Sequence, residues 1–233
     1  MLLLSLLFFS CGKSKQPAPV ANTDFLSKHQ GNNLLASMNP ENLLGFQWMN
    51  APAAVRFTDG TLQVTATEKT DFFNNPENNE VSATAPLLFK EMAGDFVLTA
   101  LVKPDFADIW NACALMVHID SLNWIKFGFE NSDATGKSIV SVVTRGVSDD
   151  SNGAVLNDAA SIWLRIIRKG NIYAMHWSAD GETFKMARLS AMPAAGLVKA
   201  GIEAQCPAGK PATHRILFLS IEERTVNDLR SGK

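Results

Sequence analysis

The order of apolar and polar residues along this chain predicts strands through most of its length. From Phe46 onward, short runs of β-branched, aromatic and aliphatic residues recur, and Gly, Asn, Asp or Pro separates them. No long helical period interrupts the runs. About ten short strands without helices predict a sandwich, and for a domain of this size a two-sheet antiparallel jelly roll. The clearest runs are Val55–Phe57, Leu62–Thr67, Phe96–Val102, Ala112–Ile119, Trp124–Phe129, Ser138–Thr144, Trp163–Arg168, Ile172–Ser178, Phe184–Leu189, Leu197–Ala204 and Ile216–Glu222.

Asp59-Gly60 predicts a tight hairpin between the first two of these runs. The residues at the centre of a two-residue hairpin turn need positive φ angles, which Asp-Gly supplies at little cost.

The run WIKFGFE, from Trp124 to Glu130, carries charge inside an otherwise apolar strand. Side chains alternate between the two faces of a strand, so Ile125, Phe127 and Phe129 share one face, which we predict to be core. The other face carries Trp124, Lys126, Gly128 and Glu130. An indole, an ammonium group, a gap and a carboxylate in a row make this second face the first candidate for a site.

The first ten residues predict an export signal. Met1–Phe9 is almost purely apolar, too short to span a bilayer and of the length of a signal-peptide core. The sequence FFSC resembles a bacterial lipobox, in which the cysteine, here Cys11, receives a diacylglyceryl group and the peptide is cut just before it. No Lys or Arg precedes the apolar run, a departure from the usual signal. An ordinary secretory signal with an incidental cysteine is the alternative.

These patterns divide the chain. We expect a protein exported to the bacterial cell envelope and attached to a membrane through its lipid alone. The predicted segments are a signal peptide at 1–10, lipidated Cys11 and a flexible tether at 11–23, a lead-in at 24–43 with a short helix near Asp24–His29 and a turn near Asn39–Leu44, the jelly-roll domain at 44–223, and a polar, partly disordered C-terminal tail at 224–233.

Composition narrows the partners. With 233 residues, 46% of them hydrophobic, the chain can build one sizeable core. The net charge is −2 with both signs spread along the chain, so no clustered basic face predicts nucleic-acid binding.

The four histidines lack metal-ligand spacing, and we predict neither metal nor cofactor. Cys113 and Cys206 are read as buried free thiols, with a disulfide as the alternative that an oxidising compartment permits.

A set of short matches, in order, resembles a known family. These matches span roughly Leu44 to Glu223 and are similar to the central signature of the regulation-of-enolase family. The members of that family are domains of unknown function with a concanavalin A-like lectin/glucanase fold. It implies a curved two-sheet jelly roll and no assigned activity. The matching pieces are Phe46-Gln47-Trp48 with Asn50 and Pro52, Asp59-Gly60 with Leu62, Thr70-Asp71-Phe72, Gly94-Asp95-Phe96, Ala114-Leu115-Met116-Val117, Trp124-Ile125-Lys126 with Gly128 and Glu130, Ser141-Val142-Val143-Thr144, Ser148-Asp149, and Ser178 with Asp180-Gly181.

The chain departs from that family at two places that could line a binding face. Asn111-Ala112-Cys113-Ala114 stands where the family often has Asp-Gln-Ala-Gly. Asp150 stands where a Trp often follows the Ser-Asp pair.

The favoured hypothesis is a non-catalytic carbohydrate-binding or accessory module that holds an oligosaccharide on its concave sheet. Trp124 would offer a flat apolar surface to a sugar, and Lys126 and Glu130 would bond its hydroxyls. Arg165 and Gln205 complete the predicted ligand-binding set, and the loop that Asp71-Phe72-Phe73 begins could border the groove. The alternative for the charged face is structural, because Lys126 and Glu130 lie about 13 Å apart along the strand and each needs a cross-strand partner.

Catalysis is the less favoured hypothesis. The Glu-x-Asp-x-x-Glu arrangement of concanavalin-like glucanases is missing, and no nucleophile elbow is present. A glycan-active hydrolase would need an unrecognised carboxylate pair from separate strands, such as Glu130 with Glu203. A structural protein without a ligand is the third possibility.

Overall fold

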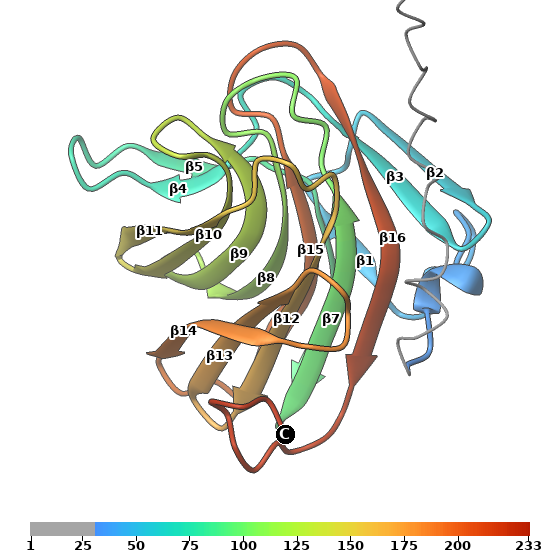
Figure 1. Cartoon of the computed structure of the whole chain (residues 1–233), viewed down its shortest axis with the longest axis vertical. Coiled ribbons are helices and arrows are strands. Elements are labelled where there is room, and N and C mark those ends of the chain that lie inside the picture. Colours follow the sequence, from blue (N-terminus) through green and yellow to red (C-terminus); the bar gives the residue numbers. More distant parts are fainter. Residues whose placement is uncertain (1–30) are drawn as a thin grey trace, which may run out of the picture.

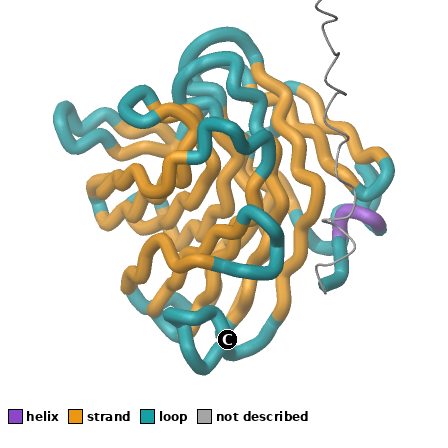
Figure 2. Tube along the Cα trace, in the orientation of Figure 1, coloured by secondary structure: helices purple, strands orange, loops and turns teal. Residues whose placement is uncertain are grey.

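The computed structural model describes residues 31–233, and these residues form two large sheets packed face to face (Figure 1). The predicted segments at 1–10 and 11–23, Cys11 and the helix near Asp24–His29 lie outside the described residues. Figure 2 shows strands throughout and one short helix, η1 (Leu34–Ala36). No helix in this described part is long and apolar enough to cross a membrane.

The first large sheet, called the pocket sheet, has seven antiparallel strands. In spatial order they are β1 (Gln47–Met49), β6 (Leu87–Ala93), β15 (Leu197–Gln205), β8 (Ala112–Asp120), β9 (Asn123–Ser132), β10 (Gly136–Arg145) and β11 (Val147–Val155).

The second large sheet, called the back sheet, also has seven antiparallel strands. Their order is β14 (Lys185–Ala191), β13 (Ile172–Ser178), β12 (Ile162–Lys169), β7 (Phe96–Lys103), β16 (Ala212–Glu222), β3 (Thr61–Ala66) and β2 (Ala54–Thr58). This arrangement confirms the predicted all-β, two-sheet antiparallel jelly-roll sandwich. The Asp59-Gly60 hairpin is also confirmed, since it joins β2 to β3 with φ angles of 50° and 70°.

A two-stranded ribbon, β4 (Phe72–Asn74) with β5 (Val81–Ala83), lies against the outer face of the pocket sheet. In Figure 1 strands β8, β9 and β10 bow, and the ribbon lies on the hollow side of the bow. This ribbon gives the outer face a small apolar core of its own, the outer cluster. Its buried members are Phe72, Ala85, Leu87, Phe89, Met116, Trp124, Val140 and Val142.

The main core lies between the two sheets and takes the face of β9 that alternation assigned to it. Ile125, Phe127 and Phe129 are fully buried there. Each such side chain stabilises the fold by roughly 1.5–3 kcal/mol through burial. Cys113 belongs to the same core, and both Cys113 and Cys206 are buried free thiols, as predicted.

Both ends of the described chain pack on the sandwich. The Asn33 side chain bonds Gly60 and Leu219, and the predicted turn near Asn39–Leu44 is present as a bridge between Asn39 and Asn42. The tail beyond residue 223 contacts the sandwich. Its Val226 is buried against the outer face of the back sheet, because an apolar cluster of that face otherwise meets water.

Candidate functional site

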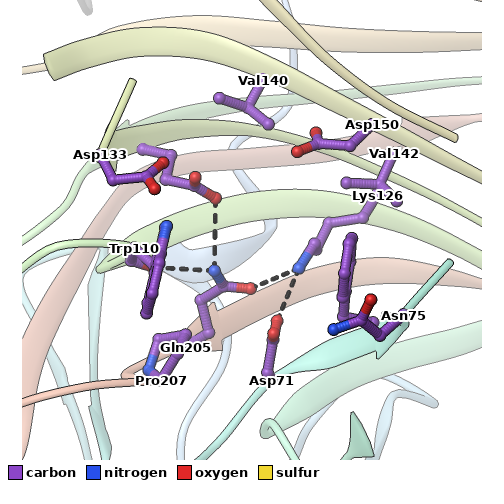
Figure 3. Close-up of a pocket in the computed structure, with 12 residues that line it drawn as sticks. Asp71, Asn75, Trp110, Lys126, Asp133, Val140, Val142, Asp150, Gln205 and Pro207 are labelled. Atoms are coloured by element: carbon purple, nitrogen blue, oxygen red, sulfur yellow. Dashed lines mark hydrogen bonds and ion pairs between the residues drawn. The ribbon is translucent and has the colours of Figure 1, made fainter. Parts of the chain in front are cut away.

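A pocket of about 380 Å³ opens on the outer face of the pocket sheet, beside the β4–β5 ribbon (Figure 3). Its walls come from the ribbon, from β9, β10 and β11, from the end of β15, and from the loops before β8 and after β9. The lining residues are Asp71, Phe73, Asn75, Trp110, Lys126, Glu130, Asp133, Val140, Val142, Asp150, Gln205 and Pro207.

Strand register explains how distant parts of the sequence meet here. Across the sheet, Lys126 lies opposite Met116 on β8 and Val142 on β10, and Val142 lies opposite Asp150 on β11. Glu130 lies opposite Ala112, which in turn lies opposite Gln205. Side chains in one such row share a face, so alternation on each strand brings all of them to the pocket side.

Gly128 lies between Lys126 and Glu130 on this face, and it serves the neighbouring strand rather than a ligand. A Cβ added at Gly128 would come within 3.0 Å of the Ala114 Cβ and 3.1 Å of the Cys113 carbonyl oxygen. The absent side chain therefore lets β8 approach β9 closely. Gly128 is not among the residues that line the pocket.

Lys126 ties the ribbon to the sheet. Its Nζ donates to Asp71 Oδ1 at 2.8 Å, to the Phe72 carbonyl oxygen at 2.9 Å and to Gln205 Oε1 at 2.6 Å. An ammonium group has three donors, so all three are used. Burial disfavours the charged form, but the carboxylates of Asp71, Glu203 and Glu130 outweigh it and raise the pKa of Lys126.

Gln205 links Lys126 to the opposite wall. Its Nε2 donates to the Trp110 carbonyl oxygen at 2.7 Å and to Glu130 Oε2 at 3.3 Å, while its Oε1 accepts from Lys126 (Figure 3). Both N–H donors of the amide are thereby occupied. Gln205 is 1% exposed, so this network holds the pocket floor in one arrangement.

Two glutamates in this region hold their protons unusually tightly. Burial raises the pKa of Glu130 to about 8, against the attraction of Lys126 and with the repulsion of Asp150, Asp71 and Asp133. Burial also raises the pKa of Glu203 to about 8. Glu203 is fully buried and does not line the pocket, and neither of its oxygens has a hydrogen-bond partner within the described part of the chain.

The open side of the pocket combines carboxylates with aromatic rings. Asp133 and Asp150 are exposed and lie on the wall across from Gln205 (Figure 3). Partial desolvation raises the pKa of Asp150 despite the attraction of Lys126. Trp110, 38% exposed, and Phe73 supply the aromatic surfaces.

Trp110 is held at the rim by its backbone. Its φ angle is +61°, which is unusual for a bulky residue. Its N–H donates to the Asn131 carbonyl oxygen at 2.7 Å, and its own carbonyl oxygen accepts from Gln205. The same amide that bonds Glu130 therefore also positions the indole.

The structure brings three of the five predicted ligand-binding residues together, namely Lys126, Glu130 and Gln205. Trp124 is not in the pocket. It is on the predicted face but 1% exposed, because Phe72 of the ribbon covers it edge-to-face at 6.1 Å between ring centroids. Trp124 therefore offers no open surface to a sugar.

Arg165 is also outside the pocket, because its strand β12 belongs to the back sheet. Its guanidinium carbon lies 3.6 Å from the centroid of the Phe184 ring, and its Nε donates to Thr99. These contacts give Arg165 a structural role on the far side of the sandwich.

Sequence reasoning missed Trp110, Asp133 and Asp150 as pocket residues. Two signals pointed towards them. Asp150 is one of the departures from the family pattern, and Asn111, which begins the other, directly follows Trp110. The expectation that the Asp71-Phe72-Phe73 segment borders the site is confirmed, since Asp71 and Phe73 line the pocket.

A sandwich of two antiparallel sheets with a lined pocket on the outer face of one sheet defines the class of protein: an all-β jelly roll of the lectin and glucanase type. Residues 48–224 match the model of the family described as "Protein of unknown function (DUF1349)", and the chain belongs to that family. It is 28% identical over 146 residues to Regulation of enolase protein 1 of Saccharomyces cerevisiae, covering 63% of this chain and 73% of that protein.

Solved structures agree with the fold. A functionally unknown protein from Saccharomyces cerevisiae superposes with a TM-score of 0.73 at 26% identity, over 78% of this chain and 98% of that one. A GH43 protein from Bacillus licheniformis superposes with a TM-score of 0.63 at 12% identity, over 81% of this chain and 38% of that chain. The exoplasmic/lumenal domain of VIP36, in a Ca²⁺/Man3GlcNAc-bound form, superposes with a TM-score of 0.53 at 9% identity, over 82% of this chain and 89% of that chain. The last two show the fold alone.

Proposed function

We propose that this domain is a non-catalytic carbohydrate-binding or accessory module that holds a glycan in the pocket. The observation that carries the proposal is the pocket's lining. An exposed indole, Trp110, stands over a floor whose amide and carboxyl groups are fixed by Gln205. An aromatic face with directional hydrogen-bonding groups beside it suits a sugar ring, which has apolar C–H faces and a polar edge.

The fold comparisons support this proposal. One solved neighbour, the VIP36 domain, is in a Ca²⁺/Man3GlcNAc-bound form, and another is a GH43 protein of which this fold forms only part. Fold likeness alone does not fix function, so the proposal rests on the pocket.

A glycan array followed by titration calorimetry tests the proposal. We expect the wild-type domain to bind a defined set of glycans and Trp110→Ala to weaken that binding on the order of tenfold, because a stacking face is lost. Leu197→Ala is the matched control, since this residue is 60% exposed at the opposite end of β15 from Gln205. Unchanged glycan binding by Trp110→Ala would show that the glycan does not bind in this pocket. An array on which the wild type binds no glycan would favour a structural protein without a ligand.

A glycan-active hydrolase is the second candidate, and one observation favours it. Glu130, with a pKa of about 8, keeps its proton near neutral pH in the same pocket as Asp150, and a protonated carboxyl group can serve as a general acid. The test is to incubate the protein with the glycans it binds and to measure new reducing ends. Reducing ends that the wild type releases and Glu130→Gln does not would favour the hydrolase over the non-catalytic module.

We also propose that the protein is a bacterial lipoprotein, exported and attached to a membrane of the cell envelope through Cys11. The FFSC sequence and the polar, Pro-containing segment after it support this proposal. The glycan would then be met outside the cytoplasm.

A further inference from the structure

The hydrogen-bond donors of the pocket floor are already used, which restricts what a ligand can be. The three donors of Lys126 and the two of Gln205 all bond groups of the protein. Within the described part of the chain, the lining side chains that keep an unused N–H are Trp110, through Nε1, and Asn75, through Nδ2. A ligand rich in acceptors therefore finds few N–H donors here, beside the proton that Glu130 keeps near neutral pH.

Acceptors, in contrast, are abundant. Asp133 and Asp150 accept no hydrogen bond from any described side chain, and Asp150 accepts one from the backbone N–H of Ser151. Glu130 uses only Oε2 and Asp71 only Oδ1 within the same set, so each keeps a second oxygen without a partner. Glu130 is 9% exposed and lines the pocket. A hydrogen bond from a ligand to its second oxygen would replace the bond to water that burial removes.

The charges follow the same pattern. Four carboxyl groups line the pocket, those of Asp71, Glu130, Asp133 and Asp150, against the one ammonium group of Lys126. That ammonium is 5% exposed and already paired with Asp71 at 2.8 Å. Lys126 also attracts Asp150. A ligand in the pocket therefore meets carboxyl groups that outnumber the cationic groups of the lining.

The carboxyl groups are also spread out. Among the described residues, no three Asp, Glu, His or Cys side chains converge as ligands of one metal ion. A single small cation is thus a poor match, whereas an organic molecule can carry its positive charge and its hydroxyl donors on separate atoms. The aromatic surfaces of Trp110 and Phe73 suit the same kind of molecule.

We propose that the pocket binds an amino sugar whose amine is free and protonated, in preference to the N-acetylated or neutral sugar of the same shape. This inference rests on the proposed carbohydrate-binding function and names its ligand class. The ammonium group would pair with the carboxylates around Asp150, the hydroxyl groups would donate to the remaining oxygens, and a ring face would pack on Trp110.

The titration behaviour of the lining groups supports the assignment. Burial, together with the neighbouring Asp150, Asp71 and Asp133, raises the pKa of Glu130 to about 8 although Lys126 opposes the shift. Burial is the largest cause of this shift, and the neighbouring carboxyl groups add to it. A bound ammonium group would oppose both effects and favour the ionised form of Glu130.

The test is titration calorimetry at pH 6 with β-1,4-linked tetramers of glucosamine, N-acetylglucosamine and glucose, which differ only in the substituent at C2. The same comparison with galactosamine, N-acetylgalactosamine and galactose covers the other common ring configuration. We expect the free-amine form to bind roughly tenfold more tightly than its acetylated and neutral counterparts in at least one series, and added salt to reduce that preference.

Charge variants test the pocket itself. Asp150→Asn and Asp133→Asn should each reduce the preference for the amine severalfold. Asp149→Asn is the matched control, because Asp149 neighbours Asp150 on β11 but points to the other face and pairs with Arg188 at 2.7 Å. This control should leave the preference unchanged.

Four results would overturn the inference. They are equal or tighter binding of the neutral or acetylated sugars, binding that requires Ca²⁺ and disappears with a chelator, a preference that survives both pocket variants, and a glycan array that is positive only for sugars without amines. In each case the proposed carbohydrate binding itself stands. A silent array together with silent titrations would remove both proposals.

Discussion

At the scale of single residues, the charged face of β9 is partly a structural network. The Lys126 ammonium is saturated by protein acceptors, so its role is to position Asp71, Phe72 and Gln205 rather than to touch a ligand. The structural hypothesis for this strand therefore fits Lys126, whereas ligand binding by Glu130 stays a prediction. Lys126 holds its neighbours, whereas Glu130 keeps an oxygen facing the pocket.

Glu203 is the residue whose burial has the least compensation. It is fully buried beside this network, and its carboxyl oxygens lack hydrogen-bond partners in the described part of the chain. Burial raises its pKa to about 8 from the ordinary value of 4.5. The folded protein therefore binds this proton more tightly than the unfolded chain does. The stability that results is complete below about pH 4.5 and is lost as the pH rises towards 8.

We predict that Glu203→Gln flattens this pH dependence. The amide resembles the protonated carboxyl group, so near pH 5 the melting temperature should differ little from that of the wild type. At pH 9 the variant should be more stable by about 1–3 kcal/mol, because a buried, poorly paired charge no longer forms. Thermal unfolding from pH 5 to 9 measures the effect, with Glu91→Gln on the exposed face of β6 as the control. Wild-type and Glu203→Gln curves that run parallel across this range would contradict the assignment.

At this scale the sequence correctly predicted which face of the sheet each β9 side chain is on. It did not predict which of those side chains other segments bury. Alternation placed Ile125 in the core and Lys126 on the other face correctly, because strand periodicity is local. It also placed Trp124 correctly on the outer face. The ribbon residue Phe72 that buries Trp124 lies far away in sequence, so no local pattern indicated it.

At the scale of elements, the β4–β5 ribbon decides what the pocket is. It covers Trp124 through Phe72, and residues on or beside it form one wall through Asp71, Phe73 and Asn75. An isolated two-stranded ribbon is marginal in water, so its attachment to the sheet must stabilise it. That attachment includes Lys126 at one end and Asn74 at the other, where Asn74 Nδ2 donates to the carbonyl oxygens of Gly146 at 2.9 Å and Ser121 at 3.3 Å.

Asn74→Ala should loosen the ribbon without unfolding the sandwich. Asn74 is 4% exposed, and its loss leaves the Gly146 carbonyl without this donor at a cost of about 1 kcal/mol. We expect amide hydrogen exchange to accelerate severalfold in residues 72–83 and to stay unchanged in β8 and β9.

Asn78→Ala is the matched control for this experiment, since Asn78 lies in the loop that joins β4 to β5 and its side chain bonds only its exposed neighbour Glu80. Unchanged exchange in residues 72–83 of Asn74→Ala, or equal acceleration in both variants, would show that Asn74 does not anchor the ribbon.

The elements that the sequence did not predict share a physical cause. Strands β4 and β5 are three residues long, and β11 is a polar edge strand whose side chains are mostly exposed. Such strands lack the apolar alternation that marks a half-buried strand, and polar residues at an edge protect it from pairing with other chains. Strand β6 is buried on both faces near its start, which also removes alternation. Most of the predicted strands have strong apolar content facing the main core, although the predicted edge strands β2 and β14 are largely exposed.

At the scale of the whole molecule, the two outer faces of the sandwich are used differently. The outer face of the back sheet is covered by the C-terminal segment through Val226 and by the packing of Phe184 near Trp163. The outer face of the pocket sheet is covered only in part, by the ribbon, and the pocket opens beside it. Family resemblance predicted the sandwich as a whole, whereas the difference between the faces depends on contacts between distant segments.

The described chain begins on the side of the molecule away from the pocket. Helix η1 packs on β3 and β16, and Figure 1 shows it at the side opposite the β4–β5 ribbon. The chain from Cys11 to residue 31, where the described part begins, spans at most about 70 Å when fully extended. An anchor at Cys11 would therefore keep the domain close to a membrane without requiring the pocket to face it.

This arrangement predicts that lipidation controls location and leaves binding intact. In a bacterial host, the full-length protein should fractionate with membranes, and its mature N-terminal peptide should carry a diacylglyceryl group on Cys11 by mass spectrometry. Cys11→Ser should shift the protein to the soluble fraction or leave its first ten residues uncleaved, while the glycan affinity of the purified domain stays the same, because no pocket residue precedes Asp71. Cys206→Ser, which alters a buried thiol instead, should remain with the membranes. Equal membrane recovery of a Cys11→Ser protein that has lost its first ten residues, or an unmodified Cys11 in the mature wild-type chain, would exclude the lipid anchor.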